Sequence, residues 1–173
     1  MKEYFDVYDR YGNYLNKCVR RGERLSEGEY FMVIHVWVEN SKGEFLIQKR
    51  AKTTDPIPHQ WAITSGLPDP GESPVDAAIR ETKEELGLTL DSDALTRFRR
   101  VVSDHNRYHT ITHVYHVTKD VALSELVLDP EEVMDAAYVT LDTILEMVRA
   151  QKFWNYEVLL DDSGYFEHLR RLD

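Results

Sequence analysis

The stretch GLPDPGESPVDAAIRETKEELGL, residues 66–88, decides the fold class of this chain, because it contains a helix whose two ends can be identified. Ser73 is a favoured N-cap residue, Pro74 suits the first helical position, and Asp76 stands three residues after the cap, in the capping role. Gly87 stands at the position after the helix that commonly adopts a left-handed conformation and is usually glycine. These signals predict a helix between Ser73 and Gly87.

The predicted helix has two chemically different sides. A narrow stripe at helical spacing, which we expect to face the core, consists of Val75, Ile79, Thr82 and Leu86. Well around the helix from it, Glu81, Glu84 and Glu85 stand at positions i, i+3 and i+4, so their carboxylates project as one cluster. Like charges at this spacing destabilise an isolated helix by roughly a few tenths of a kcal/mol per pair. The cluster therefore predicts a compensating cation.

Magnesium would provide that compensation. It binds carboxylate oxygens, keeps several waters, and prefers sites that substrate phosphates complete. A helix also holds carboxylates more rigidly than a loop does. Arg80 lies four residues before Glu84, so its side chain can hydrogen-bond to the Glu84 carboxylate and orient it toward the metal. The sequence thus indicates Glu81, Glu84 and Glu85 as ligands of Mg²⁺, with Mn²⁺ as a substitute.

A solvated acidic helix face is the simpler interpretation of three glutamates in so acidic a chain. The surroundings of the cluster favour a metal site instead. Seven charged and glycine residues stand together at fixed offsets around the capped helix: Gly66, Glu72, Arg80, Glu81, Glu84, Glu85 and Gly87. So many fixed residue types make a far more specific signal than a lone glycine-rich motif.

Residues 66–88 resemble the Nudix box: Gly, five residues, Glu, seven residues, then Arg-Glu-x-x-Glu-Glu-x-Gly and an aliphatic residue. One departure is Thr82, where the family usually has a bulky aliphatic side chain. The resemblance implies the α/β class, as a Nudix-type α/β/α sandwich with a mixed β-sheet, in which the box forms a loop–helix–loop. It also implies that Glu72 supports the site through Arg80, and that the backbone carbonyl of Ser65 joins the metal ligands.

The activity that this resemblance implies is the cleavage of a diphosphate bond in a nucleoside diphosphate joined to another group, or in a related small organic diphosphate. Water would attack phosphorus while metal ions neutralise the phosphate oxygens. Glu81 is one candidate base, and Glu131 or Glu132 is a candidate outside the box. Lys49 and Arg50, at the end of a predicted strand, are candidates to bind the substrate's phosphates.

Strands and hairpins surround the box, which predicts a mixed sheet covered on both faces. We expect an N-terminal hairpin at about residues 1–20 and a C-terminal helix at about 156–172, within a single domain that spans residues 1–173. The other expected strands are Tyr30–Val38, Phe45–Gln48, Leu95–Val102, Thr110–Val117 and Ala136–Thr140, a loop is expected at Ala51–Gln60, and another helix is expected at Leu141–Ala150.

Composition excludes several classes of protein. The formal net charge of −10 disfavours binding to nucleic acids or anionic membranes, because both require positive charge. No apolar run is long enough for a transmembrane helix, and no secretory signal is visible. The single cysteine, Cys18, fits a reducing compartment, so a cytoplasmic location is expected. A histidine metal site is not expected, since the histidines near residues 105–116 do not converge at a consistent ligand spacing.

Looser motifs, such as residues 9–12, 45–53 and 132–135, are similar to the isopentenyl-diphosphate isomerase branch of the family. That branch needs a catalytic cysteine in the segment after a loop tryptophan, which here is Trp61. Residues 62–66 are AITSG and contain no cysteine, so hydrolysis is expected rather than isomerisation. A domain that binds a nucleotide without cleaving it is a second alternative, which the complete set of box glutamates disfavours. Oligomeric state is left open, since the hairpin and the C-terminal segment could pack on their own domain or form a homodimer.

Overall fold

The computed structural model describes residues 4–51, 58–104, 109–154, 167 and 169. These residues form the following elements, in chain order: β1 (Tyr4–Tyr8), β2 (Tyr14–Arg20), β3 (Phe31–Glu39), β4 (Glu44–Arg50), β5 (Trp61–Ala62), β6 (Thr64–Gly66), α1 (Pro74–Leu86), the 3₁₀ helix η1 (Ser92–Ala94), β7 (Thr96–Ser103), β8 (Thr110–Thr118), the 3₁₀ helix η2 (Leu123–Glu125), β9 (Val133–Thr140) and α2 (Leu141–Arg149). The expected strands and the two helices around residues 74–86 and 141–149 are all present.

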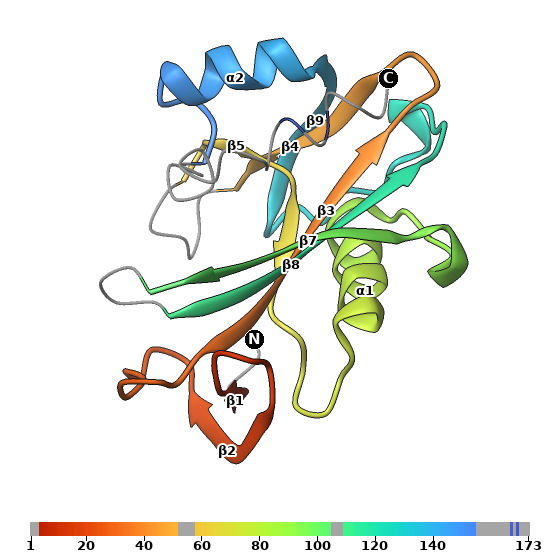
Figure 1. Ribbon diagram of the computed structural model, residues 1–173. Coiled ribbons are helices and arrows are strands. Elements are labelled where there is room, and N and C mark those ends of the chain that lie inside the picture. Colours follow the sequence, from red (N-terminus) through yellow and green to blue (C-terminus); the bar gives the residue numbers. More distant parts are fainter. Residues whose placement is uncertain (1–3, 52–57, 105–108, 155–166, 168, 170–173) are drawn as a thin grey trace.

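The main sheet has seven strands and a branched order. Neighbouring strands pair in the order β5-β4-β3-β8-β7. Outside this order, β6 pairs with β3 and β9 pairs with β4 (Figure 1). β3 and β8 run parallel, whereas the other pairs are antiparallel. The predicted mixed sheet is therefore confirmed.

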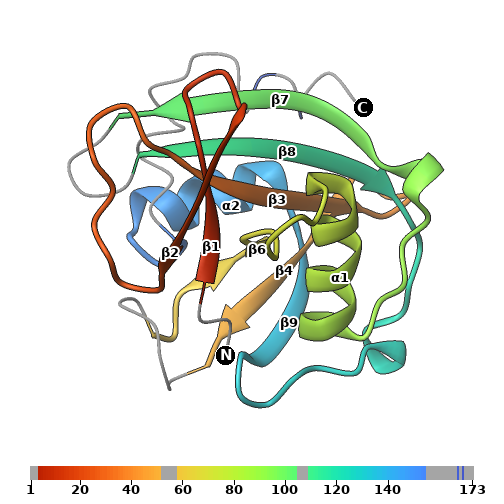
Figure 2. The same cartoon turned by 90° about the horizontal axis from the view of Figure 1, so that it is seen from below.

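Side-chain alternation along β3 separates two hydrophobic clusters, because successive residues of a strand point to opposite faces. Ile34, Val36 and Val38 pack with Ala78 of α1, while Trp37 packs on the other face with Ile144 of α2. Figures 1 and 2 show the strands between the two helices. The predicted α/β/α sandwich is confirmed.

The N-terminal hairpin forms a small sheet of its own from β1 and β2, close to the predicted residues 1–20. The rings of Phe5 and Phe31 meet edge-on with centroids 6.0 Å apart, and a β-bridge joins Tyr8 to Tyr30. These contacts hold the hairpin against the start of β3.

The C-terminal helix expected at about 156–172 lies almost entirely outside the described residues. Glu167 and Leu169 are helical, and Leu169 is buried in the cluster around Trp37. One domain spanning residues 1–173 stays a prediction. No helix in the described ranges has both the length and the apolar character to cross a membrane.

The two caps of α1 form as the sequence predicts. Ser73 Oγ accepts a hydrogen bond from the Asp76 backbone N–H at 3.2 Å, and Pro74 opens the helix. Gly87 ends it with φ +68°, and its N–H donates to Lys83 O at 3.0 Å. The positive φ is the reason for glycine at this position.

The core-facing side of α1 differs from the predicted stripe. Its buried residues are Ala77, Ala78, Glu81, Thr82, Glu85 and Leu86, while Val75 and Ile79 are only partly buried. The small side chains of the two alanines allow close contact with the sheet and the preceding loop, which brings the glutamates inward. Thr82 is fully buried and its hydroxyl donates to Ala78 O at 2.7 Å, so the polar group is satisfied.

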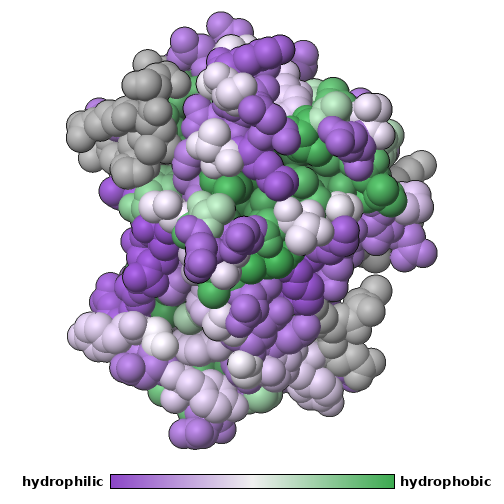
Figure 3. All heavy atoms as spheres, turned by 90° about the vertical axis from the view of Figure 1, so that its right-hand side faces the viewer, coloured by the Kyte–Doolittle hydropathy of each residue, from purple (hydrophilic) through white to green (hydrophobic). Residues whose placement is uncertain are grey.

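The segment between β8 and β9 is fastened to the end of α1. Val127 N–H donates to Leu86 O at 3.0 Å, and Asp129 N–H donates to Glu85 O at 3.1 Å. Leu123 and Val127 are 45% and 71% exposed, although both are apolar. Figure 3, which shows the right-hand side of Figure 1, has apolar atoms at the surface among hydrophilic ones.

We predict that Gly87→Ala lowers the free energy of unfolding by about 2–5 kcal/mol, which urea denaturation would measure. An added Cβ would lie 2.7 Å from Cβ of Val127 as well as in a left-handed conformation. The matched control is Gly22→Ala, at φ +90° with no atom within 4 Å of the added carbon. We expect the control to lose only about 1–3 kcal/mol. Equal losses in the two variants would contradict the steric part of this prediction.

Candidate active site

Glu81 of α1 lies directly over the backbone of β6. A Cβ at Gly66 would be only 2.3 Å from Cδ of Glu81, so this contact requires glycine. Glu81 is 8% exposed and Glu85 is 4% exposed. The prediction that the carboxylates lie well away from the core-facing side is therefore wrong for these two residues. Only Glu84 is exposed.

Glu85 is the most deeply buried carboxylate of the box. Gln48 Nε2, from β4, donates to Glu85 Oε2 at 2.8 Å. Burial raises the pKa of Glu85 to about 8, and the negative charges of Glu81 and Glu132 act in the same direction. A buried carboxylate with such neighbours is most stable in its ionised form when a cation is close to it.

Arg80 is a cation of the box itself that contacts these carboxylates. Its Nε and Nη2 each donate to one oxygen of Glu72 at 2.8 Å, and its Nη1 lies 2.9 Å from both Glu81 Oε1 and Glu84 Oε2. Its Nη2 also donates to Leu67 O at 3.3 Å. Burial works to lower the pKa of Arg80, but the carboxylates of Glu72 and Glu81 outweigh it and raise that pKa above its usual value.

Glu132, just before β9, belongs to the same electrostatic cluster. Partial burial raises its pKa, followed by the charges of Glu81, Asp129 and Glu84. Glu131 and Glu132 are both exposed residues, and the Glu131 backbone N–H donates to Asp129 Oδ1 at 2.9 Å. Of the two glutamates expected outside the box, the structure brings Glu132 into the influence of the box carboxylates.

The two cations at the end of β4 have different surroundings, since a register irregularity separates them in the pairing with β9. The positive charge of Arg50 partly opposes the rise in the pKa of Glu85 and Glu132, and its guanidinium carbon lies 4.5 Å from the ring centroid of Trp154. Lys49 Nζ lies 5.9 Å from the ring centroid of Trp61 instead. The structure thus brings Arg50 to the carboxylates and places Lys49 over a tryptophan.

Ser65 occupies the middle of β6 and pairs with His35 of β3. Its neighbour Gly66 underlies Glu81, so the Ser65 peptide is adjacent in the chain to the residue that touches a box carboxylate. This position is compatible with the carbonyl role that the sequence predicts for Ser65.

Protein partners hold the box carboxylates. Within the described ranges, no three His, Cys, Asp or Glu side chains have the geometry of a metal site. Arg80 contacts Glu81 and Glu84, and Gln48 contacts Glu85. The donor chemistry nevertheless fits a hard divalent cation, because all the candidate ligands are oxygens. The support for a metal at this site is the mutual electrostatic influence of Glu81, Glu85 and Glu132, and not a ready-made arrangement of ligands.

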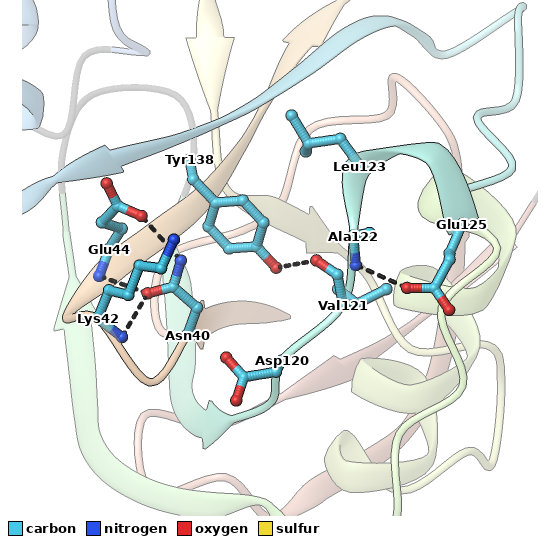
Figure 4. A pocket seen from close by; sticks show the side chains of 9 residues that line it. All are labelled: Asn40, Lys42, Glu44, Asp120, Val121, Ala122, Leu123, Glu125 and Tyr138. Atoms are coloured by element: carbon cyan, nitrogen blue, oxygen red, sulfur yellow. Dashed lines mark hydrogen bonds between the residues drawn. The ribbon is translucent and has the colours of Figure 1, made fainter.

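Two pockets of the protein lie apart from this cluster. One of about 410 Å³ lies between the β3–β4 turn, the segment that follows β8, and Tyr138 of β9 (Figure 4). The other, of about 480 Å³, lies beside Tyr30 and His109. None of the box carboxylates lines either pocket, so charge rather than cavity size locates the candidate active site.

Comparison with known proteins agrees with this geometry. The family model of the NUDIX domain matches residues 30–161. The chain belongs to the Nudix family. An uncharacterized Nudix hydrolase of Listeria innocua is 37% identical over 155 residues, which cover 89% of each chain. The expected enzyme class, a Nudix hydrolase, is confirmed, and Nudix enzymes generally use divalent metal cations.

More distant similarities extend along most of the chain. An isopentenyl-diphosphate Δ-isomerase of Streptomyces avermitilis is 28% identical over 163 residues, covering 92% of this chain and 82% of its own. A Deinococcus radiodurans structure shares the fold, with a TM-score of 0.74, 18% identity and 98% coverage of both chains. The NUDIX domain of Shewanella oneidensis NrtR, in complex with ADP ribose, has a TM-score of 0.62 and 14% identity, covering 83% of this chain and 89% of its own.

Two contacts of this Nudix site were missed from the sequence. Gln48 could have been found, because alternation along β4 places it on the same face as Leu46, toward α1. The contact between Asp6 and the Gly71 backbone had no sequence signal. A polar residue between Phe5 and Val7 predicts only that its side chain lies on the solvent-facing side of a strand.

We predict that Arg80→Lys lowers the free energy of unfolding by about 1–3 kcal/mol, because an ammonium cannot replace the two-pronged bond to Glu72. Denaturant titration would measure this loss. The control is Arg24→Lys, an exposed arginine, with an expected change within about 0.5 kcal/mol. Wild-type stability in Arg80→Lys would show that one point charge suffices between these carboxylates.

Proposed function

We propose that this Nudix protein is a magnesium-dependent hydrolase that cleaves the diphosphate bond of a nucleoside diphosphate linked to another moiety, or of a related small organic diphosphate. The observation that carries the proposal is the buried carboxylate of Glu85, whose pKa is raised by burial and by Glu81 and Glu132. This electrostatic cluster favours a divalent cation, for which Mn²⁺ is a substitute.

Glu81, Glu84 and Glu85 would hold the metal, and the carbonyl of Ser65 would add a neutral oxygen. When bound, such an ion would neutralise phosphate oxygens and lower the pKa of a coordinated water. Arg80 contacts two of these carboxylates, so Arg80 would keep Glu81 and Glu84 oriented from behind.

The remaining steps belong to side chains around the cluster. Glu132 would accept the proton of the attacking water, because its pKa is already raised above the ordinary value. Glu81 is the alternative base. Arg50 would bind the substrate's phosphates, since its guanidinium acts on both Glu85 and Glu132. Lys49, over Trp61, would contribute a more distant positive charge.

The nucleotide-linked substrate class has support from a structural neighbour. The NrtR NUDIX domain is complexed with ADP ribose, which is a nucleoside diphosphate joined to a second sugar. Because a NUDIX domain can be complexed with such a compound, binding without cleavage is the alternative function. The experiments below distinguish it from hydrolysis.

Isomerase chemistry on isopentenyl diphosphate is less well supported. The single cysteine, Cys18, lies on β2, where its Sγ–H donates to Asp6 Oδ1 at 3.0 Å. In β5, Trp61 is followed by alanine at residue 62 instead of a cysteine. A cytoplasmic location, a homodimer and the absence of nucleic-acid binding stay predictions.

We predict that Glu84→Gln and Glu85→Gln each reduce Mg²⁺-dependent hydrolysis by about 100-fold or more, because each removes a charged ligand. Release of phosphate or nucleotide from a panel of diphosphate compounds, with and without Mg²⁺, measures the loss. Glu146→Gln, an exposed glutamate of α2, is the matched control and should keep wild-type activity. Ligand binding without turnover, preserved in both box variants, would support a binding domain instead.

We predict that Gly66→Ala weakens Mg²⁺ binding by about tenfold or more while the protein stays folded, since the added methyl group displaces Glu81. Isothermal titration with Mg²⁺ and circular dichroism would measure the two effects. Gly28→Ala, with no atom within 4 Å of the added carbon, provides the control. If Gly66→Ala bound Mg²⁺ with wild-type affinity, Glu81 would not be a ligand.

A further inference from the structure

Asp6 is a buried carboxylate in the middle of β1, only 9% exposed. Its Oδ2 accepts a hydrogen bond from the backbone N–H of Gly71 at 2.8 Å, and its Oδ1 accepts one from Cys18 Sγ at 3.0 Å. Across the described residues, no Lys, Arg or His nitrogen lies within ion-pair distance of Asp6. Burying a carboxylate without a cation is costly, so the two hydrogen bonds must stabilise it.

Gly71 is the point at which the hairpin touches the Nudix box. Its φ of +78° is readily adopted only by glycine. The next residue, Glu72, closes a tight turn, in which Glu72 N–H donates to Asp69 O at 2.9 Å and Asp69 N–H donates to Glu72 Oε2 at 2.7 Å. A fixed Gly71 amide therefore fixes the position of Glu72.

From Glu72 the contacts continue to the proposed metal ligands. Glu72 receives two hydrogen bonds from Arg80, and Arg80 Nη1 lies 2.9 Å from both Glu81 and Glu84. An unbroken series of contacts thus runs from the N-terminal hairpin to the carboxylates of α1. The links made by Asp6, Glu72 and Arg80 side chains join a charged group to a partner, and such bonds are shorter and stronger than neutral ones.

We propose that Asp6 is a positioning residue, which holds the loop before α1 so that Glu72 and Arg80 keep Glu81 and Glu84 in place to bind the metal. This inference rests on the proposed function, because it assigns those glutamates as metal ligands. Attachment of the hairpin does not itself require Asp6, since Phe5 and Tyr8 already contact the start of β3.

The test compares three variants of the full chain with wild type. Asp6→Asn removes the charge and keeps the shape, whereas Cys18→Ala removes the donor to Oδ1 and leaves the bond to Gly71. Glu29→Gln is the matched control, because Glu29 accepts from Lys17 Nζ at 2.8 Å and Ser26 N–H at 2.9 Å near the hairpin without contacting the box. The measurements are thermal stability, the Kd for Mg²⁺ by titration calorimetry, the Gly71 amide signal in ¹H–¹⁵N NMR spectra, and kcat and KM.

We expect Asp6→Asn to shift the Gly71 amide signal and to raise the Kd for Mg²⁺ by about 10- to 100-fold. Its KM for the diphosphate substrate at saturating Mg²⁺ should stay near the wild-type value, because Asp6 does not touch substrate. Cys18→Ala and Glu29→Gln should keep the Kd for Mg²⁺ within about twofold of wild type, even where they lower thermal stability.

An unchanged Kd for Mg²⁺ and an unshifted Gly71 amide in folded Asp6→Asn would overturn the proposal and leave Asp6 with a structural role alone. Equal weakening in Asp6→Asn and Glu29→Gln would overturn it as well, since the effect would then follow hairpin stability. Should wild type hydrolyse no diphosphate, the proposed function fails separately, while the Mg²⁺ and NMR measurements still decide the role of Asp6.

Discussion

The guanidinium of Arg80 is the interaction on which the site depends. α1 carries five charged side chains within the six residues 80–85, and two of its glutamates are buried against the sheet. Burying a carboxylate is costly unless it has a charged or hydrogen-bonding partner. Arg80 contacts Glu72, Glu81 and Glu84 at once, because a planar guanidinium can donate in several directions. It thereby allows a helix with a buried acidic side to pack in a stable fold.

Close packing around α1 explains how the carboxylates come together. The two alanines, Ala77 and Ala78, let the helix approach the sheet, and Gly66 leaves room for Glu81 on β6. Gln48 of β4 then meets Glu85 one turn further along the helix. Small residues and an absent Cβ thus determine the depth of the glutamates, and that depth raises the pKa of Glu85.

Segments far apart in the chain converge on this helix. The β8–β9 segment donates two backbone hydrogen bonds to the last turn of α1, which brings Glu132 toward the cluster. The end of β4 brings Arg50, and the hairpin reaches the preceding loop through Asp6. The proposed hydrolytic site is therefore built by parts of the chain that are more than 100 residues apart.

The sequence by itself determined the capped helix, the mixed sheet and the spacing of the glutamates, because caps, strand alternation and residue spacing are local patterns, and its resemblance to the Nudix box implied the sandwich. Ser73 and Gly87 were sufficient to place both ends of α1. Burial of Glu81 and Glu85, the separation of Lys49 from Arg50, and the contact of Asp6 with Gly71 were decided only by the tertiary structure. These features depend on which surfaces meet and how closely, and a helical or strand period carries no information about the partner that covers each face.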